Sequence, residues 1–325
     1  MRPQETQRTA TRNLSISYIM AGEDIIISKS AGEDGQDVDA ICLGSGRFLR
    51  SVLVPFLSSN MKPAVFQTRG RNFLDSFQEQ YHRDDTDGID VVPSLCYPVD
   101  TAQFDGSTTT SDIQIYAVGT LGSPAGKYQL MESLVSKMTC ISVIGVGVTE
   151  AGMQNAENQC MLDLTELLNK FYCKSLACSN PNGRICVINT DNVPNNGDVI
   201  RSHVLKNAER YGMEVEGASS FVDFISEKVA FLNSMVDRIT SSRPDSDGLI
   251  PMCEPLPMKA LVICDQGRDL PLWMDGADVQ SRFGVRRPMY AFVRASIMGA
   301  QDQIFRESTI CLSLAHTTHS SKLNV

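Results

Sequence analysis

The sequence lacks the patterns of several classes of protein. No window approaches the roughly 18 consecutive apolar residues of a membrane-spanning helix, and the N-terminus (MRPQETQRTATRN) lacks the apolar core of a secretory signal. Acidic residues outnumber basic ones, 38 to 29, and no block of like charge is long enough to bind nucleic acid or anionic lipid. Neither a nucleic-acid nor a membrane partner is expected. The Arg- and Thr-rich start leaves an organelle-transit segment as an alternative.

Disulfide and metal patterns are also missing. The ten cysteines include no Cys-x-x-Cys pair, and several stand within apolar runs that look like strands. This distribution fits the reduced, buried thiols of a cytoplasmic protein better than a disulfide framework or a zinc site. His316 and His319 have no cysteine or carboxylate pattern beside them, so no metal site is predicted.

What the sequence does contain is the alternation of an α/β protein. Its 325 residues, 42% of them hydrophobic, can form a sizeable core. Four apolar, β-branched runs predict buried parallel strands: AICLG (40–44), AVFQT (64–68), CISVIGVGV (140–148) and ICVINT (185–190). Helical periodicity at 158–176 and 198–211, with Gly212 placed to end the second helix, predicts helices between or after them. The predicted fold is a parallel sheet covered on both faces.

Two stretches interrupt this alternation. Residues 82–112 are rich in Asp, Ser, Thr, Gly and Pro and show little periodicity, which predicts a surface loop excursion. A turn-rich joint, SSRPDSDGLIP, follows around Pro244. No internal repeat is visible, and no pattern specifies an oligomeric state, so a monomer is compatible with the sequence.

A glycine pair follows the first predicted strand, in ICLGSGRFLR (41–50). Gly44 and Gly46 stand where a dinucleotide-binding loop has its first two glycines, one for the tight turn and one for the backbone's approach to the pyrophosphate. Leu49 replaces the third glycine of that motif, so a plain strand–turn–helix is the alternative.

The end of the second predicted strand bears on the choice of cofactor. It has no acidic residue to hold ribose hydroxyls and reads QTRGR, with Arg69 and Arg71. A guanidinium here suits a 2′-phosphate, whereas solvated surface arginines are the alternative. NAD or NADP is the expected cofactor, with a slight preference for NADP.

Two later segments carry polar side chains at predicted strand or helix ends. NTDNVPNNG (189–197) brings amide side chains to the carboxyl edge of the sheet, where ligands bind in open α/β sheets. NSMVDRI (233–239) places Asp237 beside Arg238, and a structural ion pair is the alternative to a functional one.

Together, four segments resemble the long-chain mannitol dehydrogenase family, the polyol and hexuronate oxidoreductases that include mannitol dehydrogenase and the fructuronate and tagaturonate reductases. They are LGSGRFLRS (43–51), VGVTEAGM (146–153), NTDNVPNNG (189–197) and NSMVDRI (233–239). The resemblance implies a Rossmann-type doubly wound sheet over residues 38–285, after an N-terminal extension of residues 1–37. Residues 286–325 would be a remnant of a shortened, incomplete helical second domain or an unmatched tail.

The resemblance also implies the roles of individual residues. Gly44, Ser45, Gly46, Arg47 and Phe48 would line the pyrophosphate loop, and Thr149 and Glu150 would lie near the nicotinamide. With Arg69 they form the expected cofactor site. Asn192 would donate its amide to the reacting oxygen, and Asp237 would bind a substrate hydroxyl or position the catalytic group.

The family's catalytic lysine has no counterpart. The corresponding stretch reads FVRASIMGAQDQIF (292–305), with Arg294 and Gln301 nearest to the family's Lys and His. An arginine holds its proton too tightly for general acid–base work near neutral pH. The expected function is an NAD(P)-dependent oxidoreductase that transfers a hydride to or from a small sugar alcohol or hexuronate. The alternatives are a catalytically inactive nucleotide-binding or interaction protein and a truncated form of the enzyme.

Overall fold

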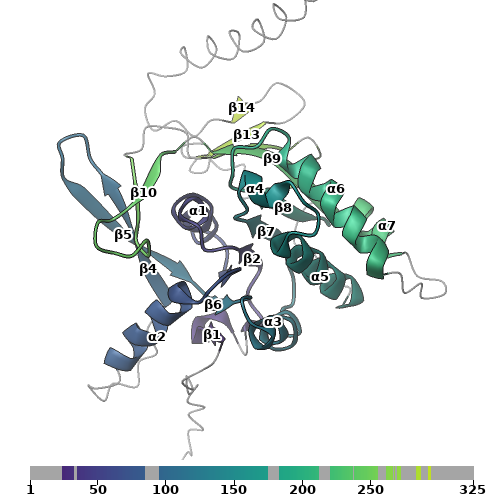
Figure 1. Ribbon diagram of the computed structural model, residues 1–325, viewed down its shortest axis with the longest axis horizontal. Coiled ribbons are helices and arrows are strands. Elements are labelled where there is room, and N and C mark those ends of the chain that lie inside the picture. The colour runs from purple at the N-terminus through teal and green to yellow at the C-terminus, as the bar shows by residue number, and fades with distance from the viewer. Residues whose placement is uncertain are drawn as a thin grey trace, which may run out of the picture.

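Six parallel strands form the centre of a ten-stranded sheet (Figure 1). In spatial order they are β6 (Ala117–Thr120), β3 (Pro63–Gln67), β2 (Ala40–Leu43), β7 (Val143–Val146), β8 (Ile185–Asn189) and β9 (Val229–Val236). Numbered along the chain, these strands run 3-2-1-4-5-6 across the sheet, which is the doubly wound order of a Rossmann fold. The predicted α/β class and Rossmann-type sheet are therefore confirmed.

The computed structural model describes most of the chain up to residue 271 and two short strands beyond it. The described residues are 24–32, 35–84, 95–174, 183–211, 220–236, 238–254, 261–265, 267, 269–271, 283–286 and 292–293. Within them, the four predicted buried strands are β2, β3, β7 and β8. The two predicted helices are α5 (Gln159–Lys174) and α6 (Asn196–Ala208), which continues into the short η6 (Glu209–Tyr211). Gly212 lies outside the described residues.

Further strands extend the sheet on both sides. β1 (Ile25–Ile27) pairs antiparallel with β6, and β12 (Leu261–Cys264) pairs antiparallel with β9. β13 (Phe283–Arg286) and β14 (Phe292–Val293) follow. Within the described residues the sheet therefore includes short edge strands from Ile25 to Val293, and the predicted domain boundaries at 38 and 285 stay a prediction.

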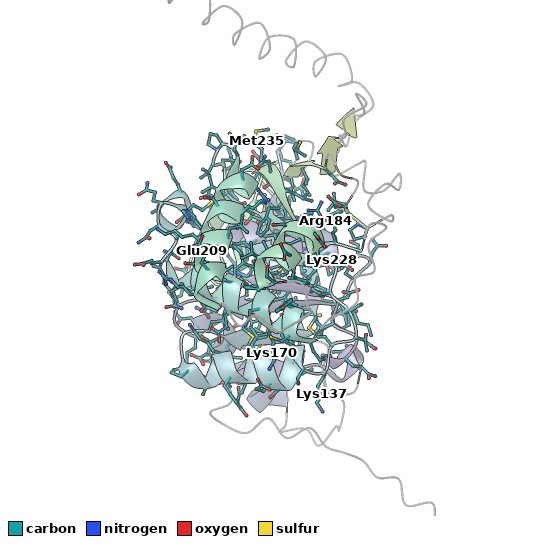
Figure 2. The ribbon with its side chains drawn as sticks, turned by 90° about the vertical axis from the view of Figure 1, so that its right-hand side faces the viewer. Lys137, Lys170, Arg184, Glu209, Lys228 and Met235 are labelled. Carbon is teal, nitrogen blue, oxygen red and sulfur yellow. The ribbon has the colours of Figure 1, made fainter. Side chains whose placement is uncertain are left out.

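Two layers cover the sheet. Along β2, Ala40 and Cys42 belong to one hydrophobic core and Ile41 and Leu43 to the other, because alternate side chains point to opposite faces. One face is covered by α3 (Pro124–Gln129), η5 (Leu130–Val135), α5, α6 and α7 (Phe221–Lys228), with Met235 at one end of the view and Lys137 at the other (Figure 2). None of the described helices is both long and apolar enough to span a membrane.

The other face is covered by helices and by a second, four-stranded sheet. The helices are η3 (Leu49–Leu53), α1 (Val54–Leu57) and α2 (Asn72–Asp84). The small sheet has the order β10 (Thr240–Ser242), β11 (Pro251–Cys253), β4 (Leu95–Ala102) and β5 (Thr108–Ile115). In Figure 1, α1 lies between the two sheets.

The predicted loop excursion at 82–112 is wrong for its second half. Residues 95–102 and 108–115 pair over their full length as an antiparallel hairpin. Leu95, Tyr97 and Val99 are buried at every second position, but this two-residue period is short and contains Pro98. The first five residues of β5 are all exposed, so they carry no apolar alternation by which the sequence could reveal a strand.

An ion pair joins the two halves of the small sheet. Arg243 donates to both carboxylate oxygens of Asp100, at 2.6 Å each, and Asp100 is 1% exposed. These hydrogen bonds hold the pKa of Asp100 below its usual 3.8. The charged form is therefore favoured by folding, and the pair stabilises the protein fully above the unfolded-state pKa and loses its effect as the pH falls through the lower folded-state value.

We expect Arg243→Met to reduce the free energy of unfolding at pH 7 by about 2 kcal/mol, since hydrogen bonds to a charged group are lost. The difference in the free energy of unfolding between variant and parent should become smaller below about pH 4, where Asp100 takes up its proton in the unfolded chain. Urea unfolding from pH 7 to pH 3 measures both effects. Arg201→Met, an exposed arginine on α6, controls for the change in net charge. If this difference in unfolding free energy does not change with pH, the ionised Arg243–Asp100 pair does not contribute to stability.

Candidate cofactor site

Segments that follow three neighbouring strands meet at one edge of the sheet. β2, β7 and β8 are adjacent and parallel, so Gly44, Thr149 and Asn192 all follow their carboxyl ends. Backbone hydrogen bonds continue between these segments, from Gly147 N to Leu43 O at 2.8 Å and from Thr190 N to Val146 O at 3.1 Å. The point between β2 and β7 is where the winding of the sheet reverses, and ligands of open α/β sheets bind at such a point.

The glycine loop has the geometry of a phosphate cradle. Gly44 has φ +113°, and a Cβ there would lie 3.1 Å from Gly147 O, so this turn requires glycine for both conformation and space. Gly46 is exposed, and a Cβ there would meet nothing within 4 Å. The loop runs into helix at Arg47, whose first turn closes with Arg50 N donating to Gly46 O at 3.0 Å. An open glycine backbone at a helix start fits the pyrophosphate of a dinucleotide.

Arg50 holds this loop, a role that the sequence reasoning missed. Its guanidinium donates to Ser45 O at 2.7 Å and Gly248 O at 2.9 Å and also to Leu249 O, and it stacks on the Phe73 ring 4.8 Å from the centroid. Burial lowers the pKa of Arg50 to about 10, which leaves it protonated at neutral pH. The available signal was its place in LGSGRFLRS (43–51), the segment that resembles the family's glycine loop.

We expect Arg50→Lys to weaken the loop although it keeps the charge. A lysine ammonium cannot reach three carbonyls with the fork geometry of a guanidinium. The free energy of unfolding should fall by about 1–3 kcal/mol, since partly buried carbonyls lose a charged donor, and NADPH affinity should fall severalfold. Arg201→Lys, the same change at an exposed arginine on α6, is the matched control. Equal stability and affinity in both variants would contradict the role of Arg50.

The segment after β7 presents exposed groups beside the glycine loop. Thr149 and Glu150 follow β7, begin α4 (Glu150–Met153) and are both exposed. Asp191 organises this corner, because its carboxylate accepts from Glu150 N at 2.7 Å and from Asn192 N at 2.9 Å. Thr149 and Glu150 therefore lie at the edge where their cofactor role was predicted, and that role stays a prediction.

Asn192 is exposed, yet its amide is engaged by the backbone. Nδ2 donates to Val236 O and Oδ1 accepts from Val236 N, both at 2.6 Å. This clamp holds the end of β9, directly before Asp237, which lies outside the described residues. One of the two Nδ2 hydrogens is therefore used within the protein, and only the second is left for a ligand. Arg238 donates to Ser51 O at 2.9 Å, so it ties the segment after β9 to η3.

A second amide, that of Asn196, links the segment after β8 to β9 in the interior of the protein. It is fully buried; Nδ2 donates to Asp191 O, Ser234 O and Ser234 Oγ, and Oδ1 accepts from Ser234 N. Next to it, a Cβ on Gly197 would lie 2.6 Å from the carbonyl carbon of Leu232. Sequence reasoning placed both residues in a ligand-binding motif but missed that they hold β9 in place.

The other residues predicted to bind the cofactor differ in whether their side chains already contact the protein. Phe48 is 40% exposed next to the glycine loop, and Arg47 reaches Ser242 Oγ at 3.3 Å. Arg69, exposed after β3, has no ion pair or hydrogen bond to the described part of the chain. Arg71 does not fit the prediction of a guanidinium that binds the 2′-phosphate of NADP, because it forms ion pairs with Asp24 at 2.6 Å and Asp75 at 2.7 Å.

Comparison with known proteins gives a family match and a distant structural match. The model of the mannitol dehydrogenase Rossmann domain matches residues 38–258. No curated protein matches the chain. Among the matching solved structures is yersinopine dehydrogenase with NADP+ bound, at 10% sequence identity and a TM-score of 0.40. That match covers 80% of this chain and 49% of the other, so the chain spans about half the length of that dehydrogenase.

The family match extends over more than half of the chain and includes the glycine loop, the β7 and β8 edges and the β9 segment. It agrees with the strand order and with a glycine cradle that fits a dinucleotide. The chain therefore belongs to the mannitol dehydrogenase family and carries its Rossmann domain, whose cofactor is NAD or NADP.

Proposed function

We propose that this protein is an NAD(P)-dependent oxidoreductase acting on the CH–OH or C=O group of a sugar alcohol or hexuronate, of the mannitol, fructuronate or tagaturonate type. The observation that carries the proposal is the meeting of Gly44, Thr149 and Asn192 at the carboxyl edge of one parallel sheet. The substrate class follows from the family alone.

The described residues have separate tasks in this proposal. Gly44 and Gly46 bind the pyrophosphate through an open backbone, and Arg50 holds the loop in that shape. When bound, the nicotinamide supplies or accepts the hydride. Thr149 and Glu150 lie on the nicotinamide side of this sheet edge. Asn192 directs its remaining Nδ2 hydrogen to the substrate oxygen and stabilises the charge that develops there.

Arg69 is proposed to contact the 2′-phosphate of NADP. Its exposed position after β3 is that of the ribose-binding residue in dinucleotide-binding folds. We expect Arg69→Gln to weaken NADPH binding about tenfold, as for one lost charge-assisted hydrogen bond, and to leave NADH binding unchanged. Fluorescence titrations with both cofactors measure this difference. Arg71→Gln, which breaks an internal ion pair, should affect both cofactors alike. An equal loss for both in Arg69→Gln would refute the assignment.

The second candidate is a protein that binds nucleotide without turnover. It is favoured by the absence of a lysine from residues 292–305 and by the engaged amide of Asn192. In that case the cofactor site is intact but no group near the substrate oxygen accepts or returns a proton.

The first experiment is a fluorescence titration of the full chain with NADH and NADPH, followed by fructose, fructuronate and tagaturonate. Saturable binding that is lost in Gly46→Ala, with oxidation of the reduced cofactor on adding one sugar, supports the oxidoreductase. Binding without oxidation supports the second candidate. No binding of either cofactor by folded protein would overturn both.

A further inference from the structure

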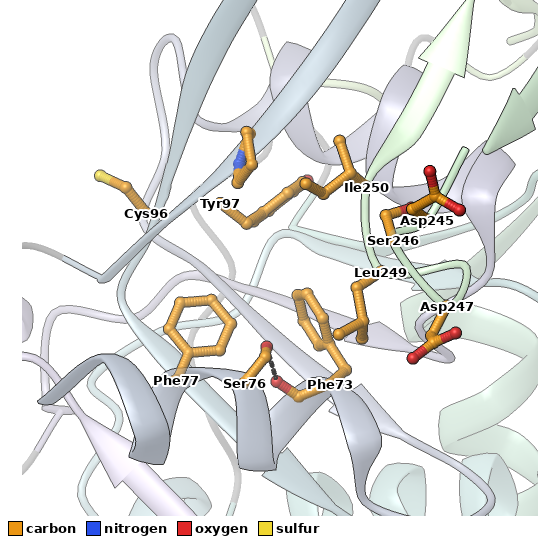
Figure 3. A pocket seen from close by; sticks show the side chains of 11 residues that line it. Phe73, Ser76, Phe77, Cys96, Tyr97, Asp245, Ser246, Asp247, Leu249 and Ile250 are labelled. Atoms are coloured by element: carbon orange, nitrogen blue, oxygen red, sulfur yellow. Dashed lines mark hydrogen bonds between the residues drawn. The ribbon is translucent and has the colours of Figure 1, made fainter. Parts of the chain in front are cut away.

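A groove of about 330 Å³ lies between α2, β4 and the turn that joins β10 to β11 (Figure 3). Its size is at the lower end of pockets that take small molecules. None of the side chains that line it has a proposed contact with cofactor or substrate, although Phe73 and Leu249 also hold Arg50, which supports the glycine loop.

Aromatic rings form one part of the groove. Phe73 and Phe77 from α2 meet edge to face at 5.2 Å between centroids, and Phe73 meets Tyr97 from β4 in the same way at 5.5 Å. All three residues are nearly fully buried, so the rings are fixed by the core. The rings therefore give the groove an apolar wall, and the Arg50 guanidinium already stacks on Phe73, 4.8 Å from the ring centroid.

The polar side chains around these rings have already donated their hydrogens. Tyr97 Oη donates to Arg50 O at 2.6 Å, Ser76 Oγ to Phe73 O at 2.7 Å and Ser246 Oγ to Arg243 O at 2.7 Å. Each of these oxygens therefore has only lone pairs left for a ligand. A ligand that enters must bring the donors.

Two carboxylates complete the acceptor set. Asp245 and Asp247 line the groove from the turn and are exposed. Within the described part of the chain neither has an ion-pair partner, because Arg243 is bound to Asp100 and Arg50 to three backbone carbonyls. The two carboxylates outnumber the single charge of Arg50, which is bound to Gly248 O and Leu249 O, so a cation that enters the groove would meet a net negative charge beside an apolar wall.

We propose that this groove binds a small organic ammonium ion that carries an aromatic or aliphatic body. The body packs on Phe73, Phe77 and Tyr97, and the ammonium group donates to Asp245, Asp247 and the serine oxygens. An anion or a neutral acceptor of the same shape is excluded, because it would face acceptors and carboxylates without a donor.

The proposal is tested by calorimetric titration of the full chain with 2-phenylethylammonium and with the matched neutral 2-phenylethanol. The ammonium ion should bind at least tenfold more tightly than the alcohol. In Asp245→Asn/Asp247→Asn this preference should disappear. Glu166→Gln/Glu209→Gln, with the same change in net charge at exposed sites on other elements, should retain it.

A second variant tests the position independently of charge. Ser76→Leu fills the groove from α2 and should weaken both probes, with the unfolding midpoint confirming that the variant is folded. Equal affinities for the ammonium ion and the alcohol, an unchanged preference in the double Asp variant, or no binding of 2-phenylethylammonium up to about 10 mM, weaker than any useful specific site, would each overturn the proposal.

Discussion

Gly46→Ala should abolish most cofactor binding in a protein that remains as stable as the parent. The added Cβ meets no protein atom within 4 Å, so the folded structure accepts it. It would nevertheless stand in the space in front of the loop, where the pyrophosphate must approach the backbone. We expect a loss of NADPH affinity of about a hundredfold, on the order of 2–3 kcal/mol, and an unfolding midpoint unchanged within about 2 °C.

Gly44→Ala is the matched contrast, because its expected effect is on folding. At φ +113° a side chain is strained, and its Cβ would press on the backbone of Gly147. The free energy of unfolding should fall by about 1–3 kcal/mol. Urea unfolding and NADPH fluorescence on the same preparations separate the two effects. If Gly46→Ala binds NADPH as the parent does, the glycine pair is only a turn in this chain.

The parallel core of the fold was predictable from sequence because its strands are buried on both faces. β2, β7 and β8 are continuous apolar runs that no helix of the same length would explain. The β4–β5 hairpin was not predictable in the same way. Half of β5 is exposed to solvent on both faces, so only pairing with β4 makes it a strand.

The site was predictable where a local constraint fixes the residue type. The φ of Gly44 and its close contact with Gly147 both require glycine at this position. The spacing of Gly44 and Gly46 makes this requirement visible in the sequence. The partners of side chains were not predictable, since they lie far along the chain. Arg50 bonds Gly248 O and Asn192 bonds Val236 O, and no local pattern specifies a backbone carbonyl 198 or 44 residues away.

Asn196→Ala should cause the largest loss of stability among the motif residues. The amide is fully buried between the β8 edge and β9, and its removal leaves Ser234 N and Asp191 O without their side-chain partner. Buried polar groups left without a partner cost about 1–3 kcal/mol each, so the free energy of unfolding should fall by about 2–4 kcal/mol. Urea unfolding at pH 7 measures it, and an alanine variant as stable as the parent would contradict the role.

Asn196→Asp distinguishes a specific donor from mere filling of space. Oδ1 can still accept from Ser234 N, but the second carboxylate oxygen would face Asp191 O and Ser234 O, where Asn196 now donates. This arrangement disfavours the charged form, so the pKa of the new carboxyl rises on folding. A group with a raised folded-state pKa of this kind costs stability at neutral pH and costs less as the pH falls through that value, since the protonated acid can donate again. Stability of Asn196→Asp relative to the parent should therefore recover between pH 7 and about pH 5, whereas Asn169→Asp, a half-buried position on α5, should show no such recovery. If the relative stability of Asn196→Asp is independent of pH, the two motifs are held together by packing and not by this hydrogen-bonded amide.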